Sequence, residues 1–543
     1  MNSERKSKSL ILGYKSMIKT EFSGYNGNRL LKDALAGLTV AAVALPLALA
    51  FGAASVDAEH AQLGILAGLI TAIIAGIVTG IFGGGSFQIS GPTGAMTVIL
   101  SGIVGGAYGI QGMFMACFMA GIILFLAGLV KLGKLLNFIP KPVITGFTSG
   151  IAIVIALGQL GNFFGVALQG ESTVDKAVCF FTDSLKSFNV LNVKTVCCSV
   201  AVMLIMILFP KKWSKIVPGS LVAIILLTLT AVIFTDFLNI KKIGEIPASI
   251  VNTETLDFSA VSFEMIKELV VPAFTIAILG MIESLMCGVS ASNMKKESFD
   301  SNIELVAQGL GNVIVPLFGG VPSTAAIART SVAIKSGGQT RLTSVFQSLF
   351  LIVCTFLLSP VIAYVPYAAL AGVLMVTAFK MNDWEDIKRY FSKKSRSSIA
   401  LFLVTMISTV VLDLIYAIII GVGASLIIML GNLSSSEADV ATDESEGITT
   451  TFAKGPLIFA NARDFVHKLG QHRAEGTKKH VIDLSGVTFV DESALEIIGE
   501  YLVEIKNEVN LLICGANAKV RDSFLKNGFT DKIGIELFSD CSD

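Results

Sequence analysis

The amino-acid sequence predicts an α-helical membrane protein followed by a small α/β domain. Hydrophobic residues make up 53% of the 543 residues, and the mean hydropathy is +0.74. Charged residues make up only 15%, against about 25% in soluble domains. Many apolar stretches reach the roughly 20 residues that cross a bilayer. The composition turns polar and acidic after Leu433. The expected parts are an N-terminal tail (1–31), a membrane domain (32–432), a linker (433–446) and a C-terminal domain (447–543).

The N-terminal segment has the features of a cytoplasmic tail. It is rich in Lys and Arg, and it lacks the apolar core and cleavage site of a signal peptide. The formal net charge is +0 and no basic recognition motif is present, so nucleic acid is not an expected partner. Eight cysteines without CxxC spacing and four scattered histidines indicate no metal site. We expect no cofactor.

Fourteen apolar segments are expected to span the membrane. They lie near 32–53, 62–82, 90–104, 110–130, 141–161, 191–210, 216–236, 271–291, 302–318, 322–335, 340–361, 366–380, 397–413 and 414–432. Basic residues follow the even-numbered spans, as Lys131 and Lys134 do after the fourth. Since Lys and Arg favour the inner side, the N-terminus is expected in the cytoplasm. An even number of spans returns the C-terminus to the same side of a cell inner (plasma) membrane.

Two of these spans are short, and both begin with small polar residues around a proline. The third starts with SGPTGA (90–95) and the tenth with VPSTAA (321–326), and FGG precedes each at a short distance. The two spans run in opposite directions by this count. Paired interrupted helices of this kind are typical of an inverted-topology repeat, here seven spans plus seven.

A helix that begins inside the membrane offers an anion site without a formal charge. Its first N–H groups are unpaired, and its dipole is positive at that end. Pro92 and Pro322 are expected in the first helical turns, where a proline lacks only an N–H that has no partner. Thr93, Ser323 and Thr324 add hydroxyl donors. The alternative is a pair of kinks that serve helix packing alone.

Two ionisable residues lie within apolar segments. Glu283 is in AILGMIESLMCGV, and Arg329 is expected about two turns into the tenth span. Charges inside a membrane are costly and usually functional. Arg329 is expected to attract the anion and Glu283 to take up a proton, because burial favours a neutral carboxyl group. The alternative is a Glu283–Arg329 ion pair that only joins helices.

The C-terminal domain alternates strands and helices. HVIDLSGVTFV (480–490) and VNLLICGA (509–516) have the pattern of buried strands. ESALEIIGEYLVEIKN (492–507) and AKVRDSFLKNGF (518–529) have that of helices. Alternation of this kind predicts an α/β sandwich.

At these residues the chain resembles the sulfate permease (SulP) family. The motifs are DALAGLTVAAVALPLALAFG (33–52), ISGPTGAMTVI (89–99), IESLMCGVSASN (282–293), ELVAQGLGN (304–312) and FGGVPSTAAIARTSVAIKSGGQT (318–340), with a C-terminal STAS domain. The resemblance implies core and gate domains, elevator-type alternating access and a homodimer. It implies that the anion contacts Thr93, Gly94, Ala95, Ser323, Thr324, Ala325 and Ala326, near Arg329, and that Phe51 walls the site.

Some residues depart from the family pattern. Pro46-Leu47 stands where sulfate carriers often have Pro-Gln, and it is more similar to the bicarbonate and dicarboxylate branches. Sodium-dependent bicarbonate carriers resembling this chain tend to have Asp, Thr and Thr where it has Glu283, Cys287 and Ile327. Loss of two hydroxyl groups removes hard oxygen ligands. We expect proton coupling, with sodium coupling as the alternative and bicarbonate, sulfate or a small dicarboxylate as the substrate.

The STAS domain resembles anti-sigma-factor antagonists. Their phosphorylated serine lies in Asp-Ser-Ser-Gly, whereas Ser493 here is flanked by Glu492 and Ala494. We interpret the domain as a docking or regulatory module with a cytoplasmic partner, and Ser493 as the candidate regulatory position.

Other functions are compatible with parts of the pattern. A nucleobase symporter of the same fold usually places carboxylates near the base and lacks a STAS domain. A membrane-tethered signalling platform would not need paired half-helices. A passive anion channel or exchanger would use the same site. No nucleophile–base constellation indicates an enzyme.

Overall fold

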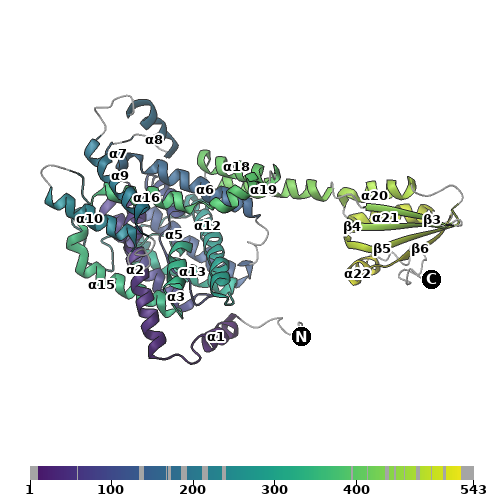
Figure 1. Ribbon diagram of the computed structural model, residues 1–543, viewed down its shortest axis with the longest axis horizontal. Helices are drawn as coiled ribbons and strands as arrows, with labels where there is room; N and C mark the ends of the chain where they lie inside the picture. Colours follow the sequence, from purple (N-terminus) through teal and green to yellow (C-terminus); the bar gives the residue numbers. More distant parts are fainter. Residues whose placement is uncertain are drawn as a thin grey trace. The chain divides into compact units, whose positions relative to one another are not determined.

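The computed structural model describes most of the chain as two compact units that divide near residue 422 (Figure 1). The described residues are 10–57, 59–133, 140–166, 168, 173–184, 192–210, 218–234, 240–392, 396–412, 414–434, 439–445, 448–457, 459–471, 477–490, 492–505 and 509–526.

A helix lies at the position of each predicted span. The first seven are α2 (Gly27–Ala54), α3 (Ala61–Phe82), α4 (Gly94–Val104), α5 (Gly109–Leu129), α6 (Lys141–Gly158), α9 (Val193–Leu208) and α10 (Gly219–Ile233). The second seven are α12 (Phe263–Lys295), α13 (Ser301–Ile314), α14 (Ile327–Lys335), α15 (Leu342–Ile362), α16 (Tyr367–Met381), α18 (Arg396–Val411) and α19 (Leu414–Ser434). Among the described residues, six helices are long and apolar enough to cross a membrane: α2, α3, α5, α6, α12 and α15. The count of 14 crossings stays a prediction.

Shorter helices lie before and between these elements. They are α1 (Leu10–Glu21), α7 (Leu160–Phe164), α8 (Thr173–Cys179), α17 (Trp384–Ser392), the π-helical turn η2 (Phe180–Ser184), and the 3₁₀ turns η5 (Phe258–Ala260) and η6 (Val315–Phe318). Several long helices begin at a side-chain cap. Asn26 caps α2, Ser262 caps α12 and Asp300 caps α13, each accepting a hydrogen bond from a backbone N–H of the first turn.

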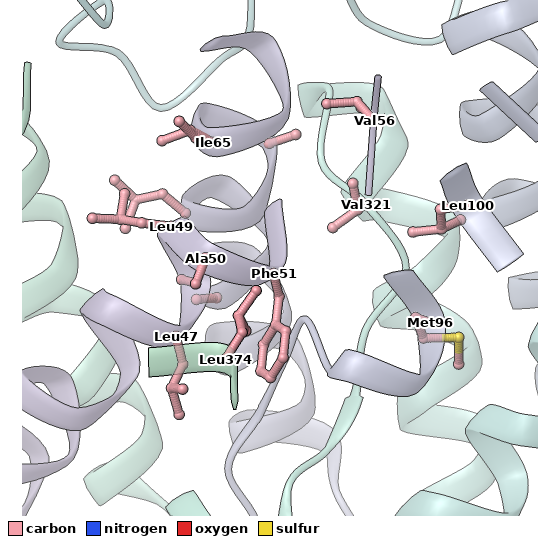
Figure 2. Packing of buried hydrophobic residues seen from close by; sticks show 14 of the residues in the cluster. Leu47, Leu49, Ala50, Phe51, Val56, Ile65, Met96, Leu100, Val321 and Leu374 are labelled. Atoms are coloured by element: carbon pink, nitrogen blue, oxygen red, sulfur yellow. The ribbon is translucent and has the colours of Figure 1, made fainter. Parts of the chain in front are cut away.

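The helices of the first unit form two groups. Helices α2, α3, α5, α12, α13 and α15 pack mainly on one another, whereas α6, α9, α10, α16 and α18 form a second group. Contacts of α16 and α10 with α2, and of α4 with α6, join the groups. Leu47 and Phe51 of α2, Leu374 of α16 and Met96 of α4 belong to one apolar cluster there (Figure 2).

The two half-helices are entered by short extended segments that pair with each other. Strand β1 (Ser90–Gly91) is antiparallel to β2 (Thr324–Ala325), with Ser90 opposite Ala325 and Gly91 opposite Thr324. Segments more than 230 residues apart in the sequence therefore meet inside the unit. The expectation that Pro92 and Pro322 lie in the first helical turns is wrong: both precede the helices, because the residues between proline and helix are extended.

The C-terminal unit is a mixed sheet with helices. It contains β3 (Asp439–Ser445), β4 (Ile448–Leu457), α20 (Phe459–Gln471), β5 (Lys479–Val490), α21 (Glu492–Ile505), β6 (Asn510–Cys514) and α22 (Ala518–Lys526). The strand order is β3-β4-β5-β6, antiparallel in the first pair and parallel in the other two. Helices α20 and α21 pack side by side (Figure 1). Phe465, Leu495 and Phe524 are among its fully buried side chains.

The predicted strands and helices of this unit are present, but the expected linker (433–446) differs from the structure. Half of it is β3, which pairs along its length with β4. Pairing of an edge strand depends on its backbone, and charged residues are common on such edges. The acidic composition that indicated a linker is therefore compatible with a strand.

Candidate functional site

Both half-helices begin without a side-chain cap. Thr93 is the N-cap residue of α4 and Ala326 that of α14, and neither side chain bonds a backbone N–H of the helix that follows. Among the other long helices with a described start, α2, α9, α12 and α13 have such a cap, whereas α3, α5, α6, α10, α15 and α16 do not. Uncapped first turns leave N–H groups and a positive dipole end available to a ligand.

The crossing of β1 and β2 brings hydroxyl groups of both starts to one carboxylate. Thr93 donates from Oγ1 to Glu283 Oε2 at 2.9 Å, and Thr324 donates to the same oxygen at 2.7 Å. The two threonine hydroxyl oxygens are 3.5 Å apart. Glu283 is supplied by α12 and is partly buried. A single ionisable group thus contacts both half-helix starts.

Arg329 lies in the first turn of α14, so its expected place two turns into the span is wrong. The reason is that residues up to Ala326 are extended, which moves the helix start toward Arg329. Its side chain is 1% exposed and donates from Nη2 to the carbonyl oxygen of Pro92 at 2.5 Å. Nε and Nη1 have no hydrogen-bond partner among the described residues.

This position of Arg329 is electrostatically unfavourable in the protein alone. A cation at the N-terminal end of a helix opposes the helix dipole. A buried charge with unpaired N–H groups adds a desolvation cost. An anion bound near these helix starts offsets both costs. Within the described residues, Glu283 and Arg329 form no ion pair. Glu283 accepts hydrogen bonds from the two threonine hydroxyls, and Arg329 donates one to the Pro92 carbonyl.

Phe51, which is expected to line the anion site, packs against the start of α4. A Cβ added to Gly94 would be 2.9 Å from Phe51 Cε1 and 2.4 Å from Ile155 Cδ1 of α6. Phe51 is 5% exposed and Ala95 is fully buried. The half-helix start is therefore packed closely between α2 and α6, which belong to different helix groups.

The structure turns some predicted contact residues away from Glu283. Ser323 bonds Asn312 through its backbone, and its hydroxyl lies toward α13, 4.0 Å from a Cβ placed on Gly311. The N–H groups of Ala325 and Ala326 bond Ser284 Oγ and the carbonyl of Ile89. Successive side chains of an extended segment point to opposite sides, so Thr324 alone in this stretch reaches Glu283.

Cys287 and Ile327, which differ from the residues of sodium-dependent bicarbonate carriers, both lie where their contacts or exposure are described. Cys287 Sγ donates to Thr330 Oγ1 at 3.3 Å, and Ile327 is 43% exposed. Neither contributes an oxygen atom beside Glu283. The described part of the chain holds no group of three or more His, Cys, Asp or Glu residues suited to a metal ion. Ser493 lies in the first turn of α21, and its side chain is outside the described residues.

Polar residues of α13 were not assigned a role from the sequence. Gln308 bonds Ser90 of β1, and Asn312 bonds Ser323 next to β2. The available signal was their spacing: Glu304, Gln308 and Asn312 recur every fourth residue in an apolar helix. This pattern predicts a polar stripe on one helix face.

We expect Gly91→Ala to impair the site. Its new Cβ would lie 2.3 Å from Arg329 Nη1, so the guanidinium group would have to leave its place beside β1. The matched control is Gly102→Ala in α4, where a Cβ meets no atom within 4 Å. Anion uptake by reconstituted vesicles should fall markedly in the first variant and persist in the second. Equal uptake by both would show that the place of Arg329 is irrelevant.

The chain is similar to known proteins over most of its length. The sequence pattern of the sulfate permease family matches residues 30–405, and that of the STAS domain matches residues 439–543. The putative sulfate transporter YvdB of Bacillus subtilis is 34% identical over 96% of this chain and 98% of that protein. The bicarbonate transporter BicA of Picosynechococcus is 30% identical, covering 90% of this chain and 89% of its own length.

Solved structures are similar as well. The transmembrane domain of a cyanobacterial bicarbonate transporter BicA aligns with a TM-score of 0.65 at 30% identity, over 73% of this chain and 98% of that domain. SLC26A9 aligns with a TM-score of 0.83 at 17% identity, over 98% of this chain and 92% of that one. At that identity the second likeness concerns the fold alone. The predicted helical membrane fold with a C-terminal STAS domain is confirmed.

Proposed function

The chain belongs to the sulfate permease family, whose members are transporters and not enzymes, and we propose that it is a secondary active carrier of a small anion. The candidate substrates are bicarbonate, sulfate and a small dicarboxylate. Relatives named as a putative sulfate transporter and a bicarbonate transporter support the first two. The proposed location is the cell inner (plasma) membrane, with both termini in the cytoplasm.

The observation that carries this proposal is the meeting of two uncapped helix starts beside a buried arginine. The anion is held between the first turns of α4 and α14, which offer backbone N–H groups at Thr93 to Ala95 and in the turn that follows Ala326. Arg329 adds positive potential, and Phe51 closes the site toward the second helix group. Ser323 and Ala325 support the site through the backbone of β2.

Transport is proposed to be coupled to protons through Glu283. A carboxyl group that accepts two hydroxyl hydrogen bonds and lies between the helix starts changes the local charge when it binds a proton. Neutralising Glu283 favours a nearby anion, and a bound anion favours protonation, because coupling is reciprocal. Sodium symport is the alternative, since Thr93 and Thr324 place two further oxygen atoms beside this carboxylate. An uncoupled channel or exchanger would use the same anion site.

The two helix groups fit an elevator-like mechanism. The group with α2, α3, α5, α12, α13 and α15 corresponds to the core domain, and the group with α6, α9, α10, α16 and α18 to the gate. The half-helices contribute the anion site to the core. Sliding of the core past the gate would expose the site to each side in turn. We propose a homodimer, and a cytoplasmic partner for the STAS domain.

Truncation after Ser434 should leave a membrane domain that still binds its anion. All proposed site residues precede this position, and β3 is removed together with the sheet to which it belongs. We expect lower expression, dimer stability or regulated rate. Calorimetry of the purified truncated protein with the transported anion checks this expectation. A folded truncated protein without anion binding would contradict the modular description.

The proposed function is tested by uptake of labelled bicarbonate, sulfate and fumarate into proteoliposomes. Saturable uptake of at least one anion above that of protein-free liposomes is expected. Imposed proton and sodium gradients then separate the two coupling schemes. Saturable uptake of none of the three would contradict the proposal for these substrates.

A further inference from the structure

Helix α13 presents three polar side chains that are buried almost completely. Glu304 and Gln308 are 0% exposed and Asn312 is 1% exposed. They recur at four-residue spacing and therefore lie on one face of the helix. Buried polar groups are costly in an apolar surrounding unless they have partners. We call these three residues the α13 ladder.

The lower part of the ladder holds the segment that leads into β1. Glu304 Oε2 accepts a hydrogen bond from the N–H of Gly84 at 2.8 Å, and Oε1 accepts one from Gln308 Nε2 at 2.8 Å. The same Gln308 nitrogen donates to Ser90 Oγ at 2.7 Å. Ser90 is the first residue of β1 and is fully buried. Gln308 thus fixes the first crossing strand to α13.

The upper part of the ladder holds the other crossing strand. Asn312 Oδ1 accepts from the N–H of Ser323 at 2.7 Å, and its Nδ2 donates to the carbonyl of Ser323 at 2.9 Å. The amide group also donates to the carbonyl of Gln308 at 2.9 Å. Ser323 directly precedes β2. Two hydrogen bonds to the backbone of one residue fix both its position and the orientation of its peptide groups.

We propose that Gln308 and Asn312 are positioning residues that set the geometry of the anion site without touching the anion. One helix face holds β1 and β2 together, and so determines where Thr93, Thr324 and the two helix starts lie. Both halves of the site are thereby attached to a single element of the core group and move with it as one body. The inference rests on the proposed anion site and adds the residues that keep its halves in register.

A positioning role differs in its consequences from a packing role. Loss of a buried packing contact lowers stability but leaves the geometry at the helix starts unchanged. Loss of the bond between Gln308 and Ser90 frees β1, so anion affinity falls while the turnover of saturated protein changes less. If both residues act through this one bond, replacing both has no larger effect than replacing Gln308 alone.

The test compares Ser90→Ala, Gln308→Met, the double variant and Asn312→Ala with a matched control, Thr355→Val. Thr355 is 2% exposed in α15, and within the described parts of the chain its hydroxyl bonds only the Leu351 carbonyl of its own helix. Hydrogen–deuterium exchange of the full-length protein is measured in the segments 88–96 and 323–329. The KM for labelled bicarbonate and sulfate is measured in proteoliposomes. The thermal midpoint is recorded for every variant.

We expect Gln308→Met and Ser90→Ala to accelerate exchange in 88–96, and Asn312→Ala in 323–329, by about fivefold or more for one lost hydrogen bond. The KM should rise by a similar factor, and the Thr355→Val control should change neither quantity. Ser90→Ala removes one oxygen atom only, which keeps the test informative if Gln308→Met folds poorly. Unchanged hydrogen–deuterium exchange in both segments would overturn the proposed positioning role. Additive effects of Ser90→Ala and Gln308→Met on exchange in the double variant would overturn it as well. Absence of anion uptake by the unmodified protein would instead contradict the proposed function, while the exchange result still decides the positioning role.

Discussion

Replacement of Arg329 by alanine is expected to reduce anion transport more than any other single change proposed for this protein. The guanidinium group is buried in the first turn of α14 and has two nitrogen atoms without partners among the described residues. Charge-assisted hydrogen bonds contribute about 1.5–3 kcal/mol. Apparent affinity should therefore fall at least about tenfold. Initial rates of uptake in proteoliposomes, measured over a range of anion concentrations, check this result.

Arg329→Lys is the matched control, because it keeps the positive charge but not the planar fork of donors. We expect it to retain part of the affinity that Arg329→Ala loses. The alanine variant should still fold and insert, since the one hydrogen bond of Arg329 to the described protein goes to the Pro92 carbonyl. Unchanged transport kinetics in Arg329→Ala would remove this residue from the site.

Glu283→Gln is expected to separate anion binding from proton coupling. A glutamine carbonyl can still accept the hydroxyl hydrogen bonds of Thr93 and Thr324, so the meeting point of the half-helices keeps its shape. The side chain is permanently neutral, as a protonated glutamate would be. The variant should bind and exchange anions, yet lose accumulation driven by a proton gradient. Uptake by the unmodified protein should rise as external pH falls, because protons then drive entry.

The measurement is uptake at several external pH values, with sodium replaced by a large inert cation. Glu268→Gln is the matched control, since Glu268 is an exposed carboxylate on the same helix and has no part in the site. It should behave as the unmodified protein. If uptake by the unmodified protein collapses without sodium and ignores the pH gradient, Glu283 is a sodium ligand and the proton scheme is wrong.

Features encoded in local sequence could be predicted. Proline, glycine and small polar residues at 90–95 and 321–326 indicated two interrupted helices, and the structure has α4 and α14 there. Glu283 was recognised because a single carboxylate in an apolar run is rare. Each of these signals lies within a few residues and needs no knowledge of distant contacts.

Features that depend on long-range pairing could not be predicted. The antiparallel pairing of Gly91 with Thr324 keeps the residues before both helices extended, and it moves the start of α14 to Ile327. That shift places Arg329 in the first turn, and it turns Ser323 toward Asn312. The partners of the α13 ladder include backbone groups of remote segments, which carry no signature of their own in the sequence.

The most direct measurement is an experimental structure determined at a saturating concentration of whichever labelled anion the protein transports. We expect density for one anion between the first turns of α4 and α14, within hydrogen-bond distance of their backbone N–H groups and close to Thr93, Thr324 and Arg329. Arg329→Ala should lack this density under the same conditions. Anion density elsewhere in the membrane domain, with the two helix starts empty, would contradict the proposed anion site.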